Sequence, residues 1–321
     1  MAIGFSMVSC GSDNDPDGGN GGLGDIPSLP KPEYENSSAK YEINPSNSPI
    51  TSIELTASGD YIIIKNPFYY GAPSKPTKNN KSSLIQNYVS HAARTSRADN
   101  SPIIYGKFIK ISDTEYILEG YGSIVIEGDT ANTFSLQITP QNGETTTVAA
   151  QKSSTIPDSE INNAICRTWN LDNIGIKMSF NNALVYNDSK PSNQLDILLE
   201  EAQNALKNYL IKHYGASSSE FDPYEPLNFY PTKVIFTKSG TYMVEYSNQT
   251  IAVSTWHWIN ESKGQFQFSW DYDDPDSTES GGSQNYVSFK NEKLFVHELH
   301  TNEEEGITIS SETIYGLSIT K

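Results

Sequence analysis

The sequence predicts a mainly β protein made of two related antiparallel β-meander or barrel modules, with one amphipathic helix inserted in the second. A hairpin pattern occurs twice, as IELTASGDYII at residues 53–63 and as VIFTKSGTYMV at residues 234–244. In each copy a glycine, which tolerates φ > 0 without steric cost, lies between two apolar runs. The length of 321 residues is enough for two domains of about 150 residues each. Aromatic residues make up 11% of the chain, and strands favour them.

The composition excludes one class of partner. The chain has 39 acidic and 22 basic residues and a net charge of −17, so it lacks the basic stripe with which proteins displace counterions from nucleic acid. We therefore expect no nucleic-acid partner. The two cysteines, Cys10 and Cys166, lie in a Gly/Asp-rich leader and in an apolar helical run. A disulfide between two such segments is not expected.

Residues 1–39 are predicted to be a lipoprotein signal remnant followed by a flexible tether. The small apolar run MAIGFSMVS ends at Cys10, and the Gly/Asp-rich stretch that follows is too poor in apolar residues to offset the entropy of ordering. MVSC at residues 7–10 resembles a bacterial lipobox, and CGSDND resembles the export tag of Bacteroidetes surface lipoproteins. The resemblance implies that Cys10 carries acyl chains and anchors the protein in outer-membrane lipid, facing the cell exterior. The alternative is an ordinary N-terminus with a chance cysteine.

Residues 40–152 are predicted to form the N-terminal β-meander module. Strands are expected at residues 53–56, 61–65, 103–111, 115–119, 123–127, 133–139 and 145–150. The pattern leaves open whether this module is a closed barrel or an open sheet. Tyr69 and Tyr70 are candidate ligand-binding residues, because they lie in a long insertion between strands, at residues 66–101, and such insertions often carry binding residues. The alternative is that the insertion packs onto its own barrel.

Residues 153–321 are predicted to form the C-terminal module. A short helix capped by Asp158 or Ser159 precedes a strand that opens at Trp169. Leucines at helical spacing between Ser192 and Gly215 predict the one long amphipathic helix. The remaining strands are expected at residues 232–237, 241–246, 251–259, 265–272, 286–290, 294–300 and 306–320.

This order of a helix, a strand that opens with tryptophan and a run of up-and-down strands resembles the lipocalin-like domains of many Bacteroidetes lipoproteins. The resemblance covers residues 160–321 and, more loosely, residues 45–150. It implies a closed barrel whose interior is either filled by side chains or able to hold one small ligand.

Catalytic motifs are absent from the sequence. It contains no Gly-x-Ser-x-Gly elbow, Walker loop, Rossmann fingerprint or Cys-x-x-Cys pair. His297 and His300 are close in sequence, but residues three apart on a strand face opposite sides and cannot share one ion without distortion. We therefore expect no catalytic residue, no metal and no cofactor, and we predict that the protein is not an enzyme. A glycoside-active enzyme, which needs two carboxylates across a groove, is a less favoured alternative.

Aromatic residues are the best candidates for ligand recognition. Trp256 and Trp258 share one face of a predicted strand, and four aromatic residues that end with Trp270 and Tyr272 share one face of the next strand. Together they predict a cross-strand ladder. Within a barrel such a ladder is more often core packing than a glycan platform, because buried aromatic rings stabilise the interior. Trp256, Trp258, Trp270 and Tyr272 remain the candidate ligand-binding residues of this module.

These observations favour a lipid-anchored cell-surface binding protein without catalytic activity. The expected ligand is a small apolar molecule, a glycan or a protein. The alternative from another class is a structural or adhesive surface component that accepts a partner's strand at an exposed strand edge. A closed second barrel favours ligand binding, and an unpaired strand favours assembly.

Overall fold

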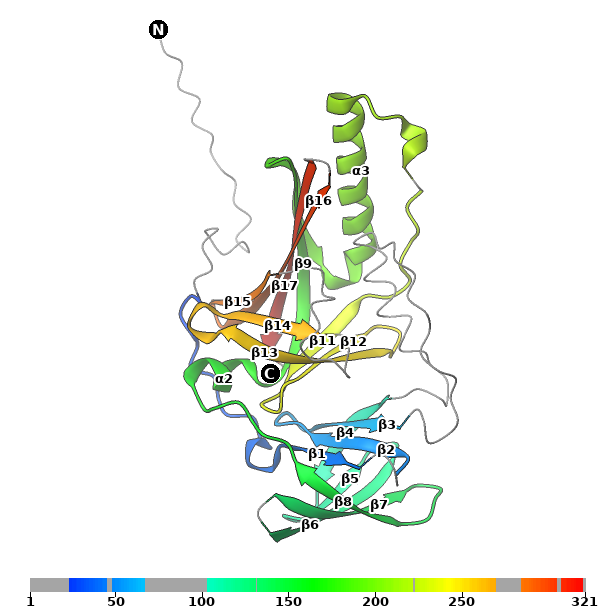
Figure 1. Ribbon diagram of the computed structural model, residues 1–321, viewed down its shortest axis with the longest axis vertical. Helices are drawn as coiled ribbons and strands as arrows, with labels where there is room; N and C mark the ends of the chain where they lie inside the picture. Colours follow the sequence, from blue (N-terminus) through cyan, green and yellow to red (C-terminus); the bar gives the residue numbers. More distant parts are fainter. Residues whose placement is uncertain are drawn as a thin grey trace.

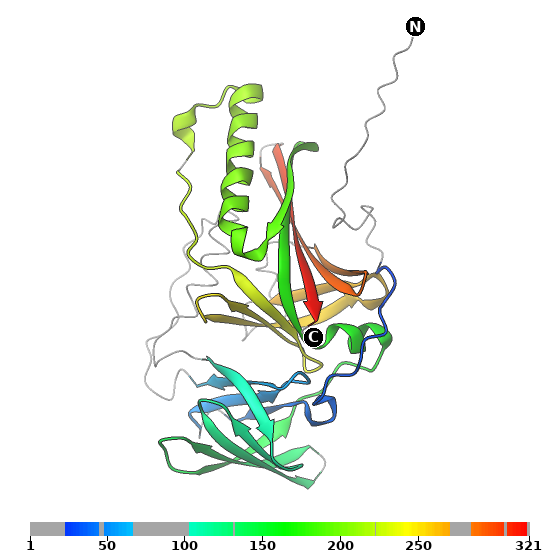
Figure 2. The same cartoon turned by 180° about the vertical axis from the view of Figure 1, so that it is seen from behind.

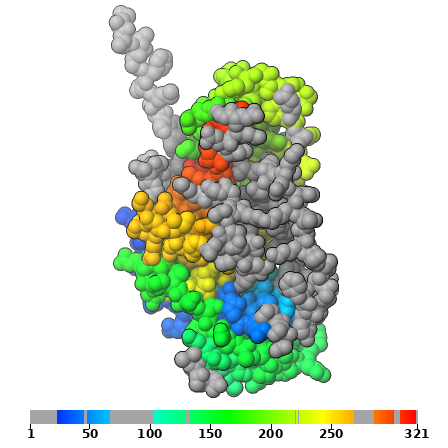
Figure 3. Space-filling view, in the orientation of Figure 1, coloured from blue at the N-terminus to red at the C-terminus, as the bar shows by residue number. Residues whose placement is uncertain are grey.

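The computed structural model describes residues 23–44, 48–66, 103–130, 132–221, 223–269, 284–304 and 307–319. They form two closed eight-stranded antiparallel barrels, the first at the bottom of Figure 1 and the second above it. The space-filling view shows the two barrels stacked along the long axis of the molecule (Figure 3). The predicted fold class is confirmed, including the amphipathic helix inserted in the second barrel.

The first barrel closes by pairing of its first and last strands. Its strands are β1 (Ala39–Ile43), β2 (Ile50–Leu55), β3 (Asp60–Lys65), β4 (Ile103–Lys110), β5 (Glu115–Leu118), β6 (Gly122–Thr130), β7 (Thr133–Pro140) and β8 (Thr146–Lys152). β1 pairs with both β2 and β8. The question that the sequence left open is thus resolved in favour of a closed barrel. Closure depends on β1, a strand that the sequence pattern had not indicated.

The second barrel repeats this order of strands. Its elements are β9 (Thr168–Phe180), β10 (Ala183–Pro191), β11 (Pro231–Phe236), β12 (Thr241–Tyr246), β13 (Ile251–Asn260), β14 (Gln265–Ser269), β15 (Gln284–Lys290), β16 (Lys293–Glu304) and β17 (Ile307–Ile319). The barrel closes because β9 pairs with both β11 and β17. β10 pairs with the upper part of β9 and lies outside the ring.

The repeated hairpin occupies the same place in both barrels. It joins β2 to β3 in the first barrel and β11 to β12 in the second, which are the second and third strands of each ring. The turn glycine has φ +81° at Gly59 and +80° at Gly240. In each turn the Oγ1 of a threonine accepts a hydrogen bond from the amide four residues later, at 3.0 Å. The two barrels therefore share one topology and one corner geometry.

Two α-helices belong to the second barrel. α2 (Glu160–Ile165) begins after Ser159, whose Oγ accepts the amide of Asn162 at 3.2 Å, so the cap is Ser159, one of the two residues predicted for it. α3 (Leu195–Tyr214) ends at Gly215 with φ +69°, also as predicted. Figures 1 and 2 show α3 beside β10 and the upper part of β9, at the end of the barrel away from the first barrel. The short 3-10 turns are η1 (Glu35–Ser37), η3 (Ser192–Gln194), η4 (Ser218–Glu220) and η5 (Glu261–Lys263).

The lower end of the second barrel is closed by α2 and a tryptophan. The indole N–H of Trp169 donates to the carbonyl of Ile165 at 2.9 Å, and Trp169 is fully buried. The guanidinium of Arg167 lies 5.9 Å from the ring of Trp169 and donates to the carbonyls of Ala164 and Asn163 at 2.9 and 2.8 Å. These bonds satisfy the end of α2 and fix the helix across the barrel.

The outer faces of the two repeated hairpins pack against each other. An apolar cluster of Ile62, Ile235, Met243 and Ile251 joins β3 of the first barrel to β11, β12 and β13 of the second. The turn of each repeated hairpin, which we call its corner, also forms hydrogen bonds with the other barrel. The carboxyl of Glu54 accepts hydrogen bonds from the hydroxyls of Ser239 and Thr241, while Ser58 and Asp60 accept the amide and hydroxyl of Thr168. The turn of the second barrel therefore bonds to the first barrel, and the turn of the first barrel bonds to the second.

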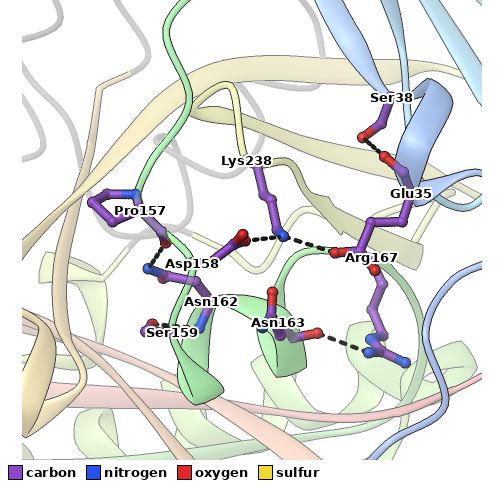
Figure 4. A network of polar contacts seen from close by, with 9 residues as sticks. All are labelled: Glu35, Ser38, Pro157, Asp158, Ser159, Asn162, Asn163, Arg167 and Lys238. Carbon is purple, nitrogen blue, oxygen red and sulfur yellow. Dashed lines mark hydrogen bonds and ion pairs between the residues drawn. The ribbon is translucent and has the colours of Figure 1, made fainter.

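Lys238, in the second corner, joins three segments that are distant in sequence (Figure 4). Its Nζ lies 2.8 Å from Glu35 Oε1, before the first barrel, and 2.6 Å from Asp158 Oδ1, in the connection to α2. Lys238 and Glu35 are mostly buried and Asp158 is exposed, so the pair with Glu35 is the less screened by solvent. This network fixes the connection between the two barrels.

Candidate functional site

The interior of the second barrel contains a patch of polar residues that has no counterpart among the described residues of β6, β7 and β8 in the first barrel. In strand order β15, β16 and β17 correspond to β6, β7 and β8. The buried inward positions of β6, β7 and β8 are apolar: Ile124, Ile126, Leu136, Ile138 and Ala150. The inward positions of β15, β16 and β17 are apolar near α2 and become polar toward α3. We call the group Asn285, Glu298, His300, Ser311, Thr313 and Tyr315 the interior polar cluster.

The strand register brings the members of this cluster together. Glu298 on β16 lies opposite Asn285 on β15 and opposite Thr313 on β17. His300 lies opposite Ser311. Directly opposed residues in an antiparallel pair have Cβ atoms about 5 Å apart, and diagonal neighbours remain within reach of long side chains. Alternation along each strand places all of them on the inward face, because Val287, Val296 and Leu317 share it.

Glu298 is a carboxyl group buried within the interior polar cluster. The hydroxyl of Tyr315 donates a hydrogen bond to Glu298 Oε2 at 3.0 Å. Burial raises the pKa of Glu298 to about 8, because water no longer solvates the charged form. Burial also raises the pKa of Tyr315, so the phenol keeps its proton. At neutral pH most of the Glu298 carboxyl is therefore neutral in the free protein.

Two members of the cluster have no hydrogen-bond partner in the part of the chain that the structure describes. Both amide atoms of Asn285, which is 1% exposed, and the hydroxyl of Ser311, which is 6% exposed, are unpaired. A buried polar group left in this state costs about 1–3 kcal/mol. Such groups are rare in native proteins and usually mark an ordered water, a ligand or a functional role.

Aromatic side chains face the interior polar cluster across the barrel. Tyr242 and Tyr246 on β12 are buried, and burial, followed by the charge of Glu298, raises the pKa of both. Tyr242 stacks on Phe268 with ring centroids 5.3 Å apart. The interior thus combines one carboxyl group with aromatic faces, which suits a small molecule with an apolar body and one polar end.

The segment between α3 and β11 is fastened at the end of the barrel near the polar cluster. Asp196 Oδ1, in the first turn of α3, accepts the hydroxyl of Tyr224 at 2.7 Å and the amide of Leu227 at 2.6 Å. Leu198 of α3 and Leu227 both pack against the core of the barrel. α3 and this segment therefore pack against the barrel at this end.

A second polar network lies on the outer face of the same strands. His297 Nδ1 lies 2.9 Å from Glu312 Oε1, and His297 Nε2 lies 3.2 Å from the hydroxyl of Ser288. Tyr286 stacks on His297 at 4.1 Å and donates to Glu312 at 2.8 Å. The order Ser, His, Glu is that of a nucleophile, a base and an orienting acid.

The surroundings of this network do not favour acyl transfer. Ser288 is buried within a strand, and the amide of the next residue, Phe289, already donates to the carbonyl of Leu23 at 2.8 Å. That amide is therefore not available to an oxyanion, which is where such an enzyme obtains much of its rate. We interpret the network as a structural link between β15, β16 and β17.

His297 and His300 lie on opposite faces of β16, as predicted. His297 belongs to the outer network and His300 to the interior polar cluster. Within the described ranges, no three His, Cys, Asp or Glu side chains lie close enough together to hold a metal ion. The thiol of Cys166 is buried and forms no disulfide, and burial raises its pKa.

The predicted ligand-binding residues fall into two groups. Trp256, 2% exposed, and Trp258 lie inside the second barrel and pair with Phe268 and Phe266, as the ladder predicted. Trp258 is partly buried and donates to Asn162 Oδ1 at 2.6 Å. Their part in binding stays a prediction. The candidate ligand-binding residues Tyr69, Tyr70, Trp270 and Tyr272 and the candidate lipidation residue Cys10 lie outside the described residues.

The interior polar cluster itself was not predicted from the sequence. A usable signal is present in the segment LFVHELH at residues 294–300. Its alternate positions are Leu294, Val296, Glu298 and His300, so one face changes from apolar to polar along a single strand. That change suggests a buried acid only once the inward face is known.

Comparisons with known proteins leave the fold and this site as the basis for a function. A scan against protein-family models found no model that matches the chain, and a search of curated proteins found no significant match. Among the described helices, none has both the length and the apolar character needed to cross a membrane.

Proposed function

We propose that the protein is a non-enzymatic binding protein whose second barrel holds a small ligand with an apolar body and one polar end. The polar end is held by the interior polar cluster, and the apolar body lies against the aromatic residues of β12, β13 and β14. In the same proposal, acyl chains on Cys10 anchor the protein in a bacterial outer membrane with both barrels facing the exterior.

The observation that carries the proposal is the pair of unpaired polar side chains, Asn285 and Ser311, beside the buried Glu298. An eight-stranded barrel is wide enough to hold one small ligand. The corresponding strands of the first barrel are apolar inside, so closure of a barrel does not by itself require these polar groups. A ligand that pairs with them recovers the free energy that they cost the unbound protein.

The alternative of assembly through strand edges has less support. Both barrels close on themselves, which removes most of the free edges that strand addition needs. The glycoside-active alternative needs two carboxyl groups that face each other across a groove. Glu298 is instead buried inside a barrel, with a tyrosine hydroxyl as its partner.

Tryptophan emission of the full chain tests the ligand proposal. The four tryptophans, at positions 169, 256, 258 and 270, all lie in the second half of the chain, so their emission reports on the second barrel. We expect saturable changes on titration with at least one of three probes of equal length: octylamine, octan-1-ol or octanoate. Asn285→Leu is expected to weaken this binding at least fivefold.

Gln137→Leu is the matched control, because it makes the same kind of change on the outward face of the first barrel. It is expected to bind like the wild type. If none of the three probes alters the emission, or if Asn285→Leu and Gln137→Leu both bind like the wild type, the unpaired groups hold only water and the ligand proposal is wrong.

The anchoring part of the proposal has an independent test. Cells that express the wild type or Cys10→Ala are labelled with a radioactive fatty acid and fractionated. We expect label and membrane retention in the wild type and neither in the variant. Equal labelling, or none in both, would remove the lipid anchor and leave the ligand proposal untouched.

A further inference from the structure

We infer that the polar end of the ligand is a protonated amine, so the second barrel binds a small aliphatic or aromatic amine in preference to a neutral or acidic molecule of the same size. This inference rests on the proposed function, because it names the chemical class of the ligand at the same site.

The residues that face Glu298 favour a cationic ligand, because none of those named below carries a positive charge near pH 7. On β17 it faces Tyr315, and on β12 it faces Tyr242 and Tyr246. β15 contributes the neutral Asn285, and β9 and α3 contribute apolar residues such as Ile176 and Leu198. His300 on its own strand has a pKa lowered by burial, so it is neutral near pH 7. Burial raises the pKa of Glu298, and none of the described residues named above as facing it is a lysine or an arginine.

This charge pattern separates three kinds of ligand. A carboxylate would lie beside Glu298, which becomes negative above about pH 8, and no basic residue among those named above would stabilise the two negative charges. A neutral hydroxyl would gain one or two hydrogen bonds. An ammonium group would gain an ion pair in a site of low dielectric, where such a pair is stronger than in water.

The available acceptors also match an ammonium group. An –NH₃⁺ group has three donors and no acceptor. The carboxyl of Glu298, the Oδ1 of Asn285 and the Oγ of Ser311 are three acceptors on three adjacent strands, and the last two have no partner among the described residues. The faces of Tyr242 and Tyr246 can stabilise the same cation by cation–π contact.

Amine binding is then linked to release of a proton. In the free protein Glu298 has a pKa of about 8, and a bound cation lowers it by favouring the ionised form. The proton leaves Glu298 for solvent as the amine binds with its own positive charge. Affinity for the amine should therefore rise by roughly 50-fold between about pH 6 and about pH 8 and then level off, whereas affinity for an alcohol should not change.

The experiment compares the three octyl probes on the full chain by tryptophan emission at about pH 6, 7 and 8. Octylamine is expected to bind at least tenfold more tightly than octan-1-ol at about pH 8, and octanoate is expected to bind most weakly. Equal binding of amine and alcohol, or affinity for the amine that is flat with pH, overturns the amine inference while the ligand proposal stands. Preference for octanoate does the same.

Glu298→Gln tests the carboxyl directly, because it keeps the size of the neutral side chain. It is expected to weaken octylamine binding at least tenfold and abolish its pH dependence, while octan-1-ol binding changes less than threefold. Retained alcohol binding shows that the variant is folded. Glu312→Gln, on the outer face of the neighbouring strand, is the control and is expected to keep both amine preference and pH dependence. If Glu298→Gln keeps them too, the inference is wrong.

Discussion

The buried carboxyl of Glu298 affects stability as well as binding. Its pKa of about 8 in the folded protein is above its ordinary value of 4.5. The unfolded chain therefore ionises first as the pH rises, and the contribution of this group to stability, fully present below about pH 4.5, is lost progressively up to about pH 8. At about 1.4 kcal/mol per pKa unit the loss is at most on the order of 5 kcal/mol.

Glu298→Gln is expected to remove this part of the pH dependence. Urea unfolding followed by tryptophan emission at about pH 5, 7 and 8.5 measures it. The free energy of unfolding of the wild type should fall across this range, and that of the variant should stay nearly level. If the free energy of unfolding changes with pH in the same way in both proteins, Glu298 is ionised in the folded state.

Glu312 gives the opposite sign on the outer face of the same sheet. Its hydrogen bond with His297, followed by that with Tyr286, lowers its pKa, although burial opposes the shift. Its contribution is present above about pH 4.5 and is lost as the pH falls through the lowered value. Glu312→Gln is expected to lower the free energy of unfolding by about 1.5–3 kcal/mol at pH 7, as a net loss of hydrogen bonding to a charged group. The difference in free energy of unfolding between wild type and variant should become smaller in acid. If the difference in free energy of unfolding between the two proteins becomes larger in acid, Glu312 does not have a lowered pKa in the folded protein.

Single residues differ in how far their roles follow from sequence. The inward position of Trp256 and Trp258 was predicted, because large aromatics at alternate positions of a strand have one favourable place, the core. Glu298 was not, because a shift of one residue in register exchanges the faces of the strand. Only its position opposite Asn285 and its hydrogen bond from Tyr315 show that this acid is inside the barrel.

At the scale of elements, the repeated corner was predicted and β1 was not. The corner carries its own signal, a glycine between two apolar runs. β1 has the sequence AKYEI, with one lysine and one glutamate in five residues, and is a strand because β2 and β8 both pair with it. Such closure depends on residues far apart in the chain, so local patterns do not reveal it.

The turn between β11 and β12 is expected to require glycine at position 240. Gly240 has φ +80°, and an added Cβ would lie 3.2 Å from the carbonyl oxygen of Trp256. Gly215, at the end of α3, has φ +69° but open space around it. Since the left-handed conformation alone costs an L-residue about 1–2 kcal/mol, Gly240→Ala should destabilise more than Gly215→Ala in urea unfolding. Equal losses would show that the corner relaxes around the methyl group.

At the scale of the whole molecule, the two barrels are joined through their equivalent hairpins. Ile62 and Met243 occupy equivalent places in the repeated pattern and meet in one apolar cluster. The polar contacts are not equivalent: Glu54 receives two hydroxyls from the second corner, and Thr168 binds the first corner. The two barrels thus share one topology and one apolar hairpin contact but differ in the polar residues at the turns and in their interiors.

Replacement of Glu54 by alanine tests whether the two barrels unfold together. It is 2% exposed and accepts the hydroxyls of Ser239 and Thr241. Glu54→Ala leaves the hydroxyl of Thr241 without a partner, whereas that of Ser239 keeps its contact with Thr237 at 3.2 Å. The variant should therefore cost about 1–3 kcal/mol, the cost of one buried unpaired group. Glu127→Ala is the control, because Glu127 is exposed on β6 and its side chain bonds to no other described residue.

Circular dichroism reports on both barrels, and tryptophan emission reports on the second alone. In the wild type and in Glu127→Ala we expect one transition with the same midpoint by both methods, because a shared interface couples the two barrels. In Glu54→Ala the midpoints should fall and separate. The barrel that unfolds first is then identified by whether the emission change precedes or follows the change in circular dichroism. Coincident and unshifted transitions in Glu54→Ala would mean that the apolar cluster of Ile62, Ile235, Met243 and Ile251 alone couples the barrels.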